Sequence, residues 1–139
     1  KLLNKKVHLP QDLVVALSLG TKTAKIVATD AVPKKYMILD IGPKTIKDYI
    51  RILSGAKLVV WNGPFGYFEN KKFVHGSKAI MQALARSRAK VIIGGGETVE
   101  LAQELKLDKK FDFISTGGGA MLTFLEGGRL PSLERLRVK

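Results

Sequence analysis

The sequence predicts an α/β fold in which helices cover both faces of a parallel sheet. Two stretches support this prediction, because each passes from an apolar strand through three glycines into a helix: residues 91–105 (VIIGGGETVELAQEL) and residues 111–125 (FDFISTGGGAMLTFL). In the first stretch Val91, Ile92 and Ile93 are apolar and β-branched without polar alternation. That pattern is typical of a strand buried on both faces of a parallel sheet.

A third turn, residues 62–66 (NGPFG), follows the apolar strand at residues 58–61 in the same way. Strand-to-helix turns of a parallel sheet meet at its carboxyl edge, where open α/β folds bind their ligands. The three glycines at residues 94–96 have no Cβ, so a ligand can approach the backbone of the first turn closely. Glu97 and Thr98 then begin a helix whose first amides lack intrahelical partners and attract anions. A single glycine run can equally make only a tight turn, but three converging turns favour a phosphate or nucleotide site.

Composition predicts one globular domain. The 139 residues are 45% hydrophobic and 26% charged, which is enough for one sizeable core. There is no cysteine, which excludes disulfides, thiolate metal sites and a cysteine nucleophile. No apolar run is long enough to span a bilayer, and the first residues lack the apolar core of a secretion signal. We therefore expect a cytoplasmic protein without a membrane partner.

The net charge of +12 raises the question of nucleic acid. The basic residues, however, occur as scattered pairs at expected loops and helix ends, without interleaved aromatic residues or a recognisable nucleic-acid motif. We expect no specific nucleic-acid partner. Small anionic substrates explain the charge better, and simple solvation of the surface is the alternative.

The first half of the chain is expected to hold strands and one helix. The expected strands are an interrupted strand at residues 7–9 and 13–17, a half-exposed strand or hairpin arm at 21–29, and, after a turn at 32–35, a strand at 37–41. The expected helix starts at Pro43, buries Ile46, Tyr49, Ile50 and Leu53, and ends at Gly55.

The second half is expected to alternate strands with helices, which implies right-handed crossovers. The expected strands lie at residues 58–61, 91–93 and 111–114, and a polar loop is expected at 108–110. One helix is expected from an N-cap at Ser77 to residue 86, with Ile80, Ala83 and Leu84 inward, and a second from Glu97, with Thr98, Leu101, Ala102 and Leu105 on one face. A third helix is expected through Met121, Leu122 and Leu125, and a short fourth one from Pro131 with Leu133 and Leu136.

Four motifs together resemble the phosphoglycerate kinase family: DIGPKT at residues 40–45, VVWNGPFGYFE at 59–69, IIGGGET at 92–98, and STGGGA with LEGGRLP within 115–131. Their order and spacing match the later part of that family. The resemblance implies a Rossmann-like three-layer fold with a mainly parallel sheet. It identifies residues 1–139 as a partial C-terminal nucleotide-binding domain of a two-domain kinase, incomplete at its N-terminal side.

The resemblance also implies a reaction. The family transfers a phosphoryl group reversibly between 1,3-bisphosphoglycerate and ADP, giving 3-phosphoglycerate and ATP in glycolysis, with Mg²⁺. The partners expected here are an adenine nucleotide, ADP or ATP, and phosphoglycerate held by an N-terminal domain that this chain lacks. The chain alone is expected to be inactive. The alternative is a non-catalytic nucleotide- or partner-binding module that has kept the fold.

The resemblance assigns roles to particular residues. Leu39 would line the adenine slot, and Glu69 would accept hydrogen bonds from the ribose. The remaining residues would surround the nucleotide and its phosphates: Asn62, Pro64 and Gly66 beside the nucleotide, Gly95, Gly96 and Thr98 at the phosphates, Glu97 at the metal, and Gly117, Gly118 and Gly119 as the catalytic glycines facing the phosphoryl group in transit.

The chain departs from the family at two of these positions. Glu97 stands where the family has a Mg²⁺-binding aspartate, and Ile38 stands where it has glycine beside the adenine. These departures favour the non-catalytic alternative. The absence of the domain's first strands is expected to expose strand edges and to permit self-association.

Overall fold

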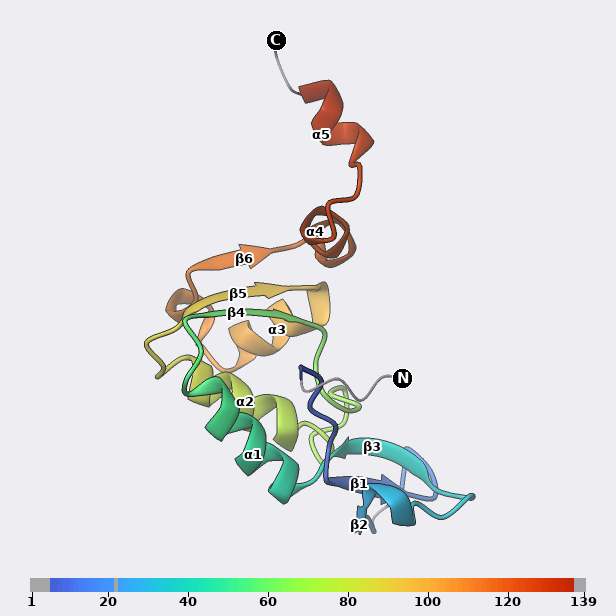
Figure 1. Cartoon of the computed structure of the whole chain (residues 1–139). Coiled ribbons are helices and arrows are strands. Elements are labelled where there is room, and N and C mark those ends of the chain that lie inside the picture. The colour runs from blue at the N-terminus through green and yellow to red at the C-terminus, as the bar shows by residue number, and fades with distance from the viewer. Residues whose placement is uncertain (1–5, 22, 137–139) are drawn as a thin grey trace. The chain divides into compact units, whose positions relative to one another are not determined.

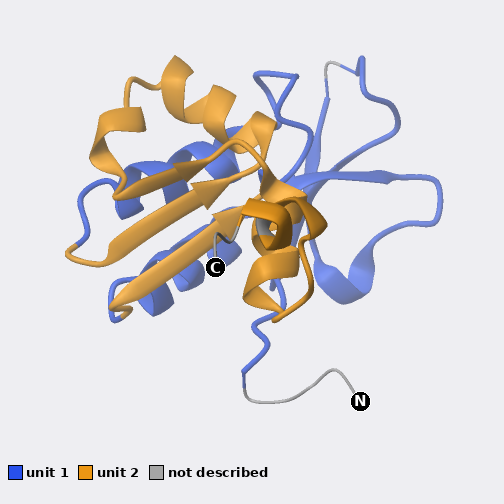
Figure 2. Ribbon diagram, turned by 90° about the horizontal axis from the view of Figure 1, so that it is seen from above, with its two compact units in different colours: residues 1–55, 64–87 blue, residues 56–63, 88–139 orange. Residues whose placement is uncertain are grey.

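The computed structural model describes residues 6–21 and 23–136, the side chain of Leu133 excepted. The chain divides into two compact units, one of residues 1–55 and 64–87 and the other of residues 56–63 and 88–139 (Figure 2). We call them unit 1 and unit 2. Each unit has its own three-stranded sheet.

Unit 1 contains an antiparallel sheet. Its strands are β1 (Asp12–Ala16), β2 (Lys25–Ala28) and β3 (Met37–Ile41), in the order β2-β1-β3, and the short 3-10 helix η1 (Thr29–Ala31) follows β2. The sequence predicted a mainly parallel sheet, whereas these three strands pair antiparallel. The described residues of the two connections, 17–21, 23–24 and 29–36, contain no crossover helix, and parallel neighbours need a crossover of a dozen or more residues.

The helices of unit 1 are α1 (Pro43–Leu53) and α2 (His75–Leu84), which pack against each other. The start of α1 at Pro43 confirms the prediction. The core of this unit joins strand and helix residues: Leu13, Val15, Ala16, Leu39, Ile41, Phe73, Ile80, Met81 and Leu84. Residues 7–9, expected as the first part of a strand, lie outside the sheet, which begins at Asp12.

The prediction that Ser77 is an N-cap was wrong. The helix α2 starts two residues earlier, at His75, so Ser77 lies within its first turn and is buried. Its hydroxyl accepts a hydrogen bond from the amide of Phe65 at 2.6 Å and donates one to the carbonyl of the same residue at 2.8 Å. Ser77 therefore holds a preceding loop rather than capping its own helix.

The capping groups of both helices come from strands. The carboxylate of Asp12 on β1 accepts hydrogen bonds from the amides of Lys44 and Thr45 at the start of α1. The carboxylate of Asp40 on β3 accepts one from the amide of Gly76 at the start of α2, at 3.0 Å. These bonds satisfy amides that have no partner within a helix.

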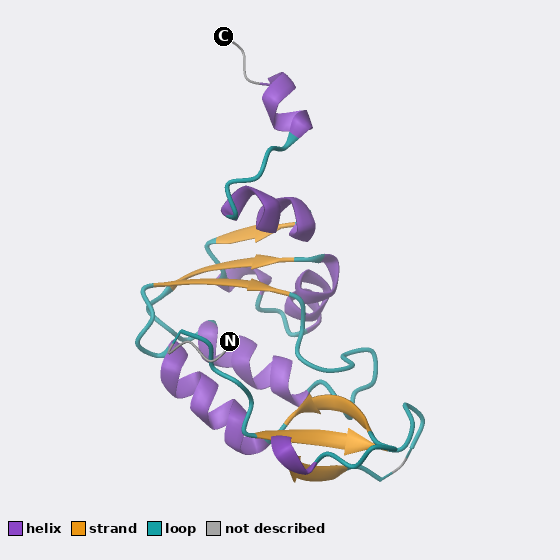
Figure 3. Cartoon of the chain, turned by 45° about the vertical axis from the view of Figure 1, so that its right-hand side comes forward, coloured by secondary structure: helices purple, strands orange, loops and turns teal. Residues whose placement is uncertain are grey.

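Unit 2 contains a parallel sheet, as the sequence predicted. Its strands are β4 (Leu58–Asn62), β5 (Lys90–Gly94) and β6 (Phe113–Ser115), in that order. The helix α3 (Gly96–Glu104) packs against β5, and η2 (Asp108–Lys110), α4 (Gly118–Leu125) and α5 (Pro131–Leu136) complete the unit (Figure 3). The core of this unit contains Val59, Trp61, Val91, Ile93, Leu101, Ala102 and Phe111.

Two details of unit 2 differ from the expectation. Residues 108–110 form a 3-10 turn rather than a loop, and β6 begins at Phe113 rather than at residue 111. The side chain of Asp112 accepts a hydrogen bond from the amide of Val91 at 2.8 Å, so the entry to β6 is held by a side chain.

The strands of the parallel sheet alternate in burial. Val59 and Trp61 are buried, whereas Leu58 and Val60 are 58% and 38% exposed and Phe113 is 60% exposed. Val60, Ile92 and Phe113 are neighbours across the three strands, so they form one apolar row. In the described part of the chain, no helix has the length and apolar character to cross a membrane.

Candidate functional site

The predicted strand-to-helix turns of unit 2 lie at one edge of its sheet. Asn62, Gly94 and Ser115 are register partners, so the three parallel strands end in the same row. The chain then enters α3 after β5 and α4 after β6, as Figure 1 shows. This arrangement confirms the expectation that the turns meet at the carboxyl edge of a parallel sheet.

The turn before α3 requires glycine. Gly95 is the N-cap of α3 and has φ of 87°, a conformation that side chains disfavour. Gly95 and Gly117, the N-caps of α3 and α4, make no side-chain cap hydrogen bonds. The first amides of these helices therefore suit an anionic ligand, which the positive end of each helix dipole also favours.

Thr98 lies in the first turn of α3 and is fully buried. Its hydroxyl oxygen accepts a hydrogen bond from the amide of Gly63 at 2.9 Å, while the indole nitrogen of Trp61 donates to the carbonyl of Gly63 at 2.6 Å. Both bonds fix the backbone just after Asn62. Thr98 thus joins the turn after β4 to the turn after β5, and its predicted place beside a phosphate remains a prediction.

The three glycines before and within α4 differ in their surroundings. Gly118 is buried, whereas Gly117 and Gly119 are exposed. Gly96, at the start of α3, is also exposed. A ligand could reach the backbone of these exposed glycines, and Gly95 beside them is half-buried.

Glu97 follows Gly96 in the first turn of α3, and its side chain is exposed. Within residues 6–21 and 23–136, no three His, Asp or Glu side chains gather into a metal site. A single carboxylate nevertheless fits Mg²⁺, because this ion commonly keeps several waters and takes one or two carboxylates together with substrate phosphates.

The other predicted nucleotide residues belong to unit 1. Leu39 is only 3% exposed and packs with Ala16 and Phe73, while its carbonyl accepts a hydrogen bond from the amide of Tyr67 at 2.8 Å. Its neighbour Ile38 is 58% exposed. On this strand, therefore, the side chains open to a ligand are those of Ile38 and of Met37, which is 43% exposed.

Three more of them lie in the loop before α2. Pro64 is half-buried, whereas Gly66 and Glu69 are exposed. Gly66 has φ of 72°. The amide of Tyr67, which follows Gly66, is the donor to the Leu39 carbonyl, so Gly66 and Leu39 are held close together.

Sequence reasoning missed the two carboxylates that start the helices. Burial raises the pKa of Asp12, but hydrogen bonds from Thr45 and Lys44 outweigh burial, so this pKa lies below its ordinary value of 3.8. Burial dominates at Asp40 and raises its pKa above 3.8, although bonds from Gly76 and Ile41 oppose it. The available signal was an acidic residue inside each apolar strand, at Asp12 in DLVVA and Asp40 in MILDI.

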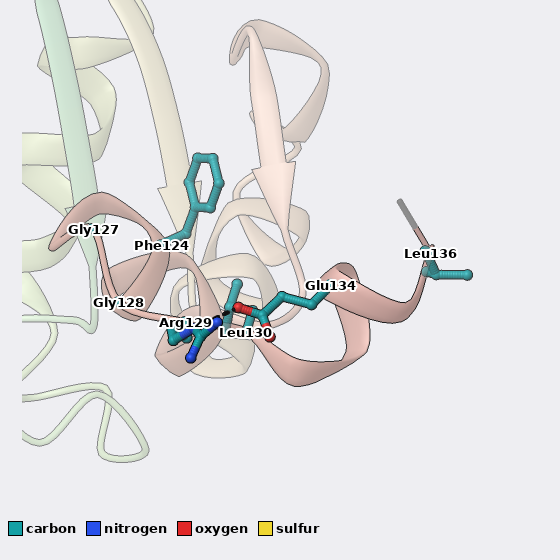
Figure 4. A pocket seen from close by; sticks show the side chains of 7 residues that line it. All are labelled: Phe124, Gly127, Gly128, Arg129, Leu130, Glu134 and Leu136. Atoms are coloured by element: carbon teal, nitrogen blue, oxygen red, sulfur yellow. Dashed lines mark hydrogen bonds and ion pairs between the residues drawn. The ribbon is translucent and has the colours of Figure 1, made fainter. Parts of the chain in front are cut away.

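A separate hollow lies between α4 and α5 (Figure 4). Its volume is about 590 Å³, and an ion pair of 2.8 Å joins the Nε of Arg129 to the Oε1 of Glu134 beside it. Its lining comes from the end of α4, the following loop and α5: Phe124, Gly127, Gly128, Arg129, Leu130, Glu134 and Leu136. None of these is a predicted site residue.

Comparison with known proteins points to one family. The family model described as phosphoglycerate kinase matches residues 1–128. A phosphoglycerate kinase of Moorella thermoacetica and one of Herpetosiphon aurantiacus are each 45% identical to the chain over 135 residues, covering 96% of the chain and 34% of the relative. The chain thus spans about a third of the length of these curated relatives.

Solved structures agree. The phosphoglycerate kinase of Coxiella burnetii aligns with a TM-score of 0.84 and 40% identity, covering 91% of this chain and 33% of that one. The enzyme of Pyrococcus horikoshii aligns with a TM-score of 0.79 and 35% identity, covering 92% and 32%. Because the family model matches residues 1–128 and both sequence and fold agree with these relatives, the chain belongs to the phosphoglycerate kinase family.

Proposed function

We propose that the chain is the nucleotide-binding part of a phosphoglycerate kinase, serving the reversible phosphoryl transfer between 1,3-bisphosphoglycerate and ADP. One observation carries the proposal. Two helices, α3 and α4, begin at adjacent glycine turns on the carboxyl edge of a parallel sheet, and their N-cap residues give no side-chain cap. Such helix starts bind phosphate through their amides. A role in glycolysis would place the protein in the cytoplasm.

Each turn would contribute differently to the nucleotide. The amides at Gly95 and Gly96 would hold the phosphates of ADP or ATP, and those at Gly117 and Gly119 would face the phosphoryl group in transit. Donors held in place in this way stabilise the charge of the transition state, which is most of what a phosphotransferase contributes. Phosphoglycerate would bind outside this chain.

Glu97 would hold Mg²⁺ together with the nucleotide phosphates. When bound, the metal ion neutralises phosphate charge during transfer. The exposed position of Glu97 beside Gly96 supports this assignment, because its carboxylate can reach solvent and ligand.

Calorimetric titration of the chain with ADP tests the proposal. We expect saturable binding that Mg²⁺ strengthens. In Glu97→Gln the side chain keeps its shape but loses its charge, so the effect of Mg²⁺ should fall while binding without the metal persists. If the unchanged chain shows no saturable binding of ADP with or without Mg²⁺, the proposed function is wrong for this chain.

A second candidate is a non-catalytic nucleotide- or partner-binding module. The exposed side chain of Ile38, at a position where the family has glycine, favours it because this side chain could narrow an adenine slot. The titration of Ile38→Gly separates the candidates. A large gain in ADP affinity would mean that Ile38 has impaired the slot, and an unchanged affinity would favour a working kinase site.

A further inference from the structure

The turns before α3 and α4 meet at Gly95 and Gly118. A Cβ placed on Gly118 would collide with the side-chain amide oxygen of Asn62, and would lie 2.8 Å from both the Cα and the amide nitrogen of Gly95. Real Cβ atoms do not approach other atoms so closely. The first turn of α4 therefore rests on Asn62 and on the backbone of the α3 turn, with no room for a side chain.

Asn62 touches both turns. Its side-chain oxygen lies 3.1 Å from where a Cβ on Gly95 would stand and 3.2 Å from where one on Gly94 would stand. Asn62 is the last residue of β4, so a single side chain at the end of β4 contacts the turns that follow β5 and β6.

The next glycine in α4 has different surroundings. A Cβ on Gly119 would meet nothing within 4 Å, and the same holds for Gly96 in α3. Among the glycines of the two motifs, Gly94 and Gly118 are therefore tightly packed, Gly94 against the side chain of Met121, whereas Gly96 and Gly119 are open. Because Gly118 and Gly119 are neighbours in one helix, they form a matched pair for experiment.

We propose that Asn62 is a positioning residue that sets the spacing between the α3 and α4 turns by contact with Gly95 and Gly118. This role rests on the proposed nucleotide function, because the spacing matters if the amides of both helix starts serve one phosphate chain. The open glycines, Gly96 and Gly119, then face the ligand, and Gly118 serves the contact between the turns.

Thermal unfolding of single and double variants tests the contact without any ligand. Gly118→Ala should lower Tm, and Gly119→Ala should not, because alanine favours a helix where space is open. Combining Gly118→Ala with Asn62→Ala should recover part of the loss, since one of the colliding groups is gone. Equal effects of the two glycine variants, or strictly additive effects in the double variant, would overturn the contact.

Amide resonances of the ¹⁵N-labelled chain report positioning directly. Asn62→Ala should shift the resonances of both Gly96 and Gly119, because both turns lose the same spacer. Gly119→Ala should leave those of Gly95 and Gly96 in place. If Asn62→Ala shifts only the residues that follow β4, Asn62 does not position the turns.

Replacing Asn62 by aspartate, which has the same shape but a negative charge, tests how the contact between Asn62 and Gly118 relates to ADP binding. Asn62→Asp keeps the spacer, so Gly118→Ala should cost the same Tm in this background as in the unchanged chain. Its carboxylate should oppose ADP phosphates and weaken binding about tenfold or more. If the unchanged chain binds no ADP, the proposed function fails, whereas the unfolding and resonance measurements still decide whether Asn62 positions the turns.

Discussion

At the scale of single residues, Asp12 stands out because one carboxylate begins a helix that lies far along the chain. Its Oδ1 accepts hydrogen bonds from the Thr45 amide at 2.8 Å and the Thr45 hydroxyl at 2.7 Å, and its Oδ2 accepts one from the Lys44 amide at 3.1 Å. The Thr45 hydroxyl oxygen in turn accepts a bond from the amide of Asp12. Asp12 and Thr45 are buried, and the bond from Lys44 is part-buried.

Asp12→Ala should lower the free energy of unfolding by about 1–3 kcal/mol, because it leaves buried donors without an acceptor. Urea denaturation monitored by circular dichroism measures this change. Asp30→Ala removes an exposed aspartate from η1 and should change the midpoint little. Equal effects of the two variants would contradict the capping role of Asp12.

The two buried carboxylates should respond to acid in opposite directions. The pKa of Asp12 is lowered, so its contribution to stability is present above 3.8 and is lost as pH falls below that value. The pKa of Asp40 is raised, so the folded state takes up a proton before the unfolded state does, and stability decreases as pH rises from 3.8 through the folded pKa.

Denaturation curves between pH 3 and pH 7 for Asp12→Asn and Asp40→Asn would reveal this difference. The advantage of the unchanged chain over Asp12→Asn should shrink in acid. Relative to Asp40→Asn, the unchanged chain should instead gain stability in acid. Parallel pH profiles for all three proteins would show that neither carboxylate titrates differently on folding.

At the scale of elements, the loop before α2 depends on a serine inside the helix. The hydroxyl of Ser77 both accepts from and donates to the backbone of Phe65. Ser77→Ala should cost about 1–2 kcal/mol in the free energy of unfolding, because the half-buried amide and carbonyl of Phe65 each lose a hydrogen bond. Guanidinium denaturation measures the cost. Ser18→Ala, at an exposed serine, is the control, and an equal loss in both variants would contradict the role of Ser77.

The sequence predicted those elements whose causes are local. The β-branched run at residues 91–93 and the glycines that follow it are sufficient to specify a strand, a turn and a helix start, although Ile92 is only half-buried. Pro43 likewise marks the first residue of α1. The candidate phosphate site was predicted for the same reason, since each of its turns is contiguous in the sequence.

Elements that depend on distant partners were predicted less well. Ser77 has the chemistry of an N-cap, but Asp40 on β3 bonds to the amide of Gly76 and the helix starts earlier. The antiparallel pairing of β1 with β2 and β3 depends on partners that periodicity does not identify. The contact of Asn62 with Gly118 joins residues from different strand ends, and no spacing rule predicts it.

At the scale of the whole molecule, the chain covers about a third of the length of its curated relatives. We therefore expect it to bind nucleotide without catalysing phosphoryl transfer. The purified chain should bind ADP but form no ATP from 1,3-bisphosphoglycerate, because the resemblance assigns phosphoglycerate binding to another domain. A coupled assay for ATP, with an intact phosphoglycerate kinase as the positive control, measures this. Turnover by the pure chain would refute the prediction.

The exposed apolar row on the parallel sheet should promote self-association, since open sheets expose edges and faces that another chain can cover. Phe113→Lys should reduce any concentration-dependent increase in mass in sedimentation experiments. Ile26→Lys replaces an equally exposed apolar residue on β2, where the exposed fractions are 60% for Phe113 and 61% for Ile26. A larger effect of the β2 variant would place the association on the antiparallel sheet instead.

The capping of α1 and α2 by strand residues has a consequence for the order of folding. Asp12 lies 33 positions before Thr45, and Asp40 lies 36 positions before Gly76. Until the distant strand arrives, the first amides of each helix have only water as a partner, so each helix start gains stability when the sheet assembles. Because closing such loops costs entropy before any contact forms, unit 1 should fold as one late and cooperative event rather than helix by helix.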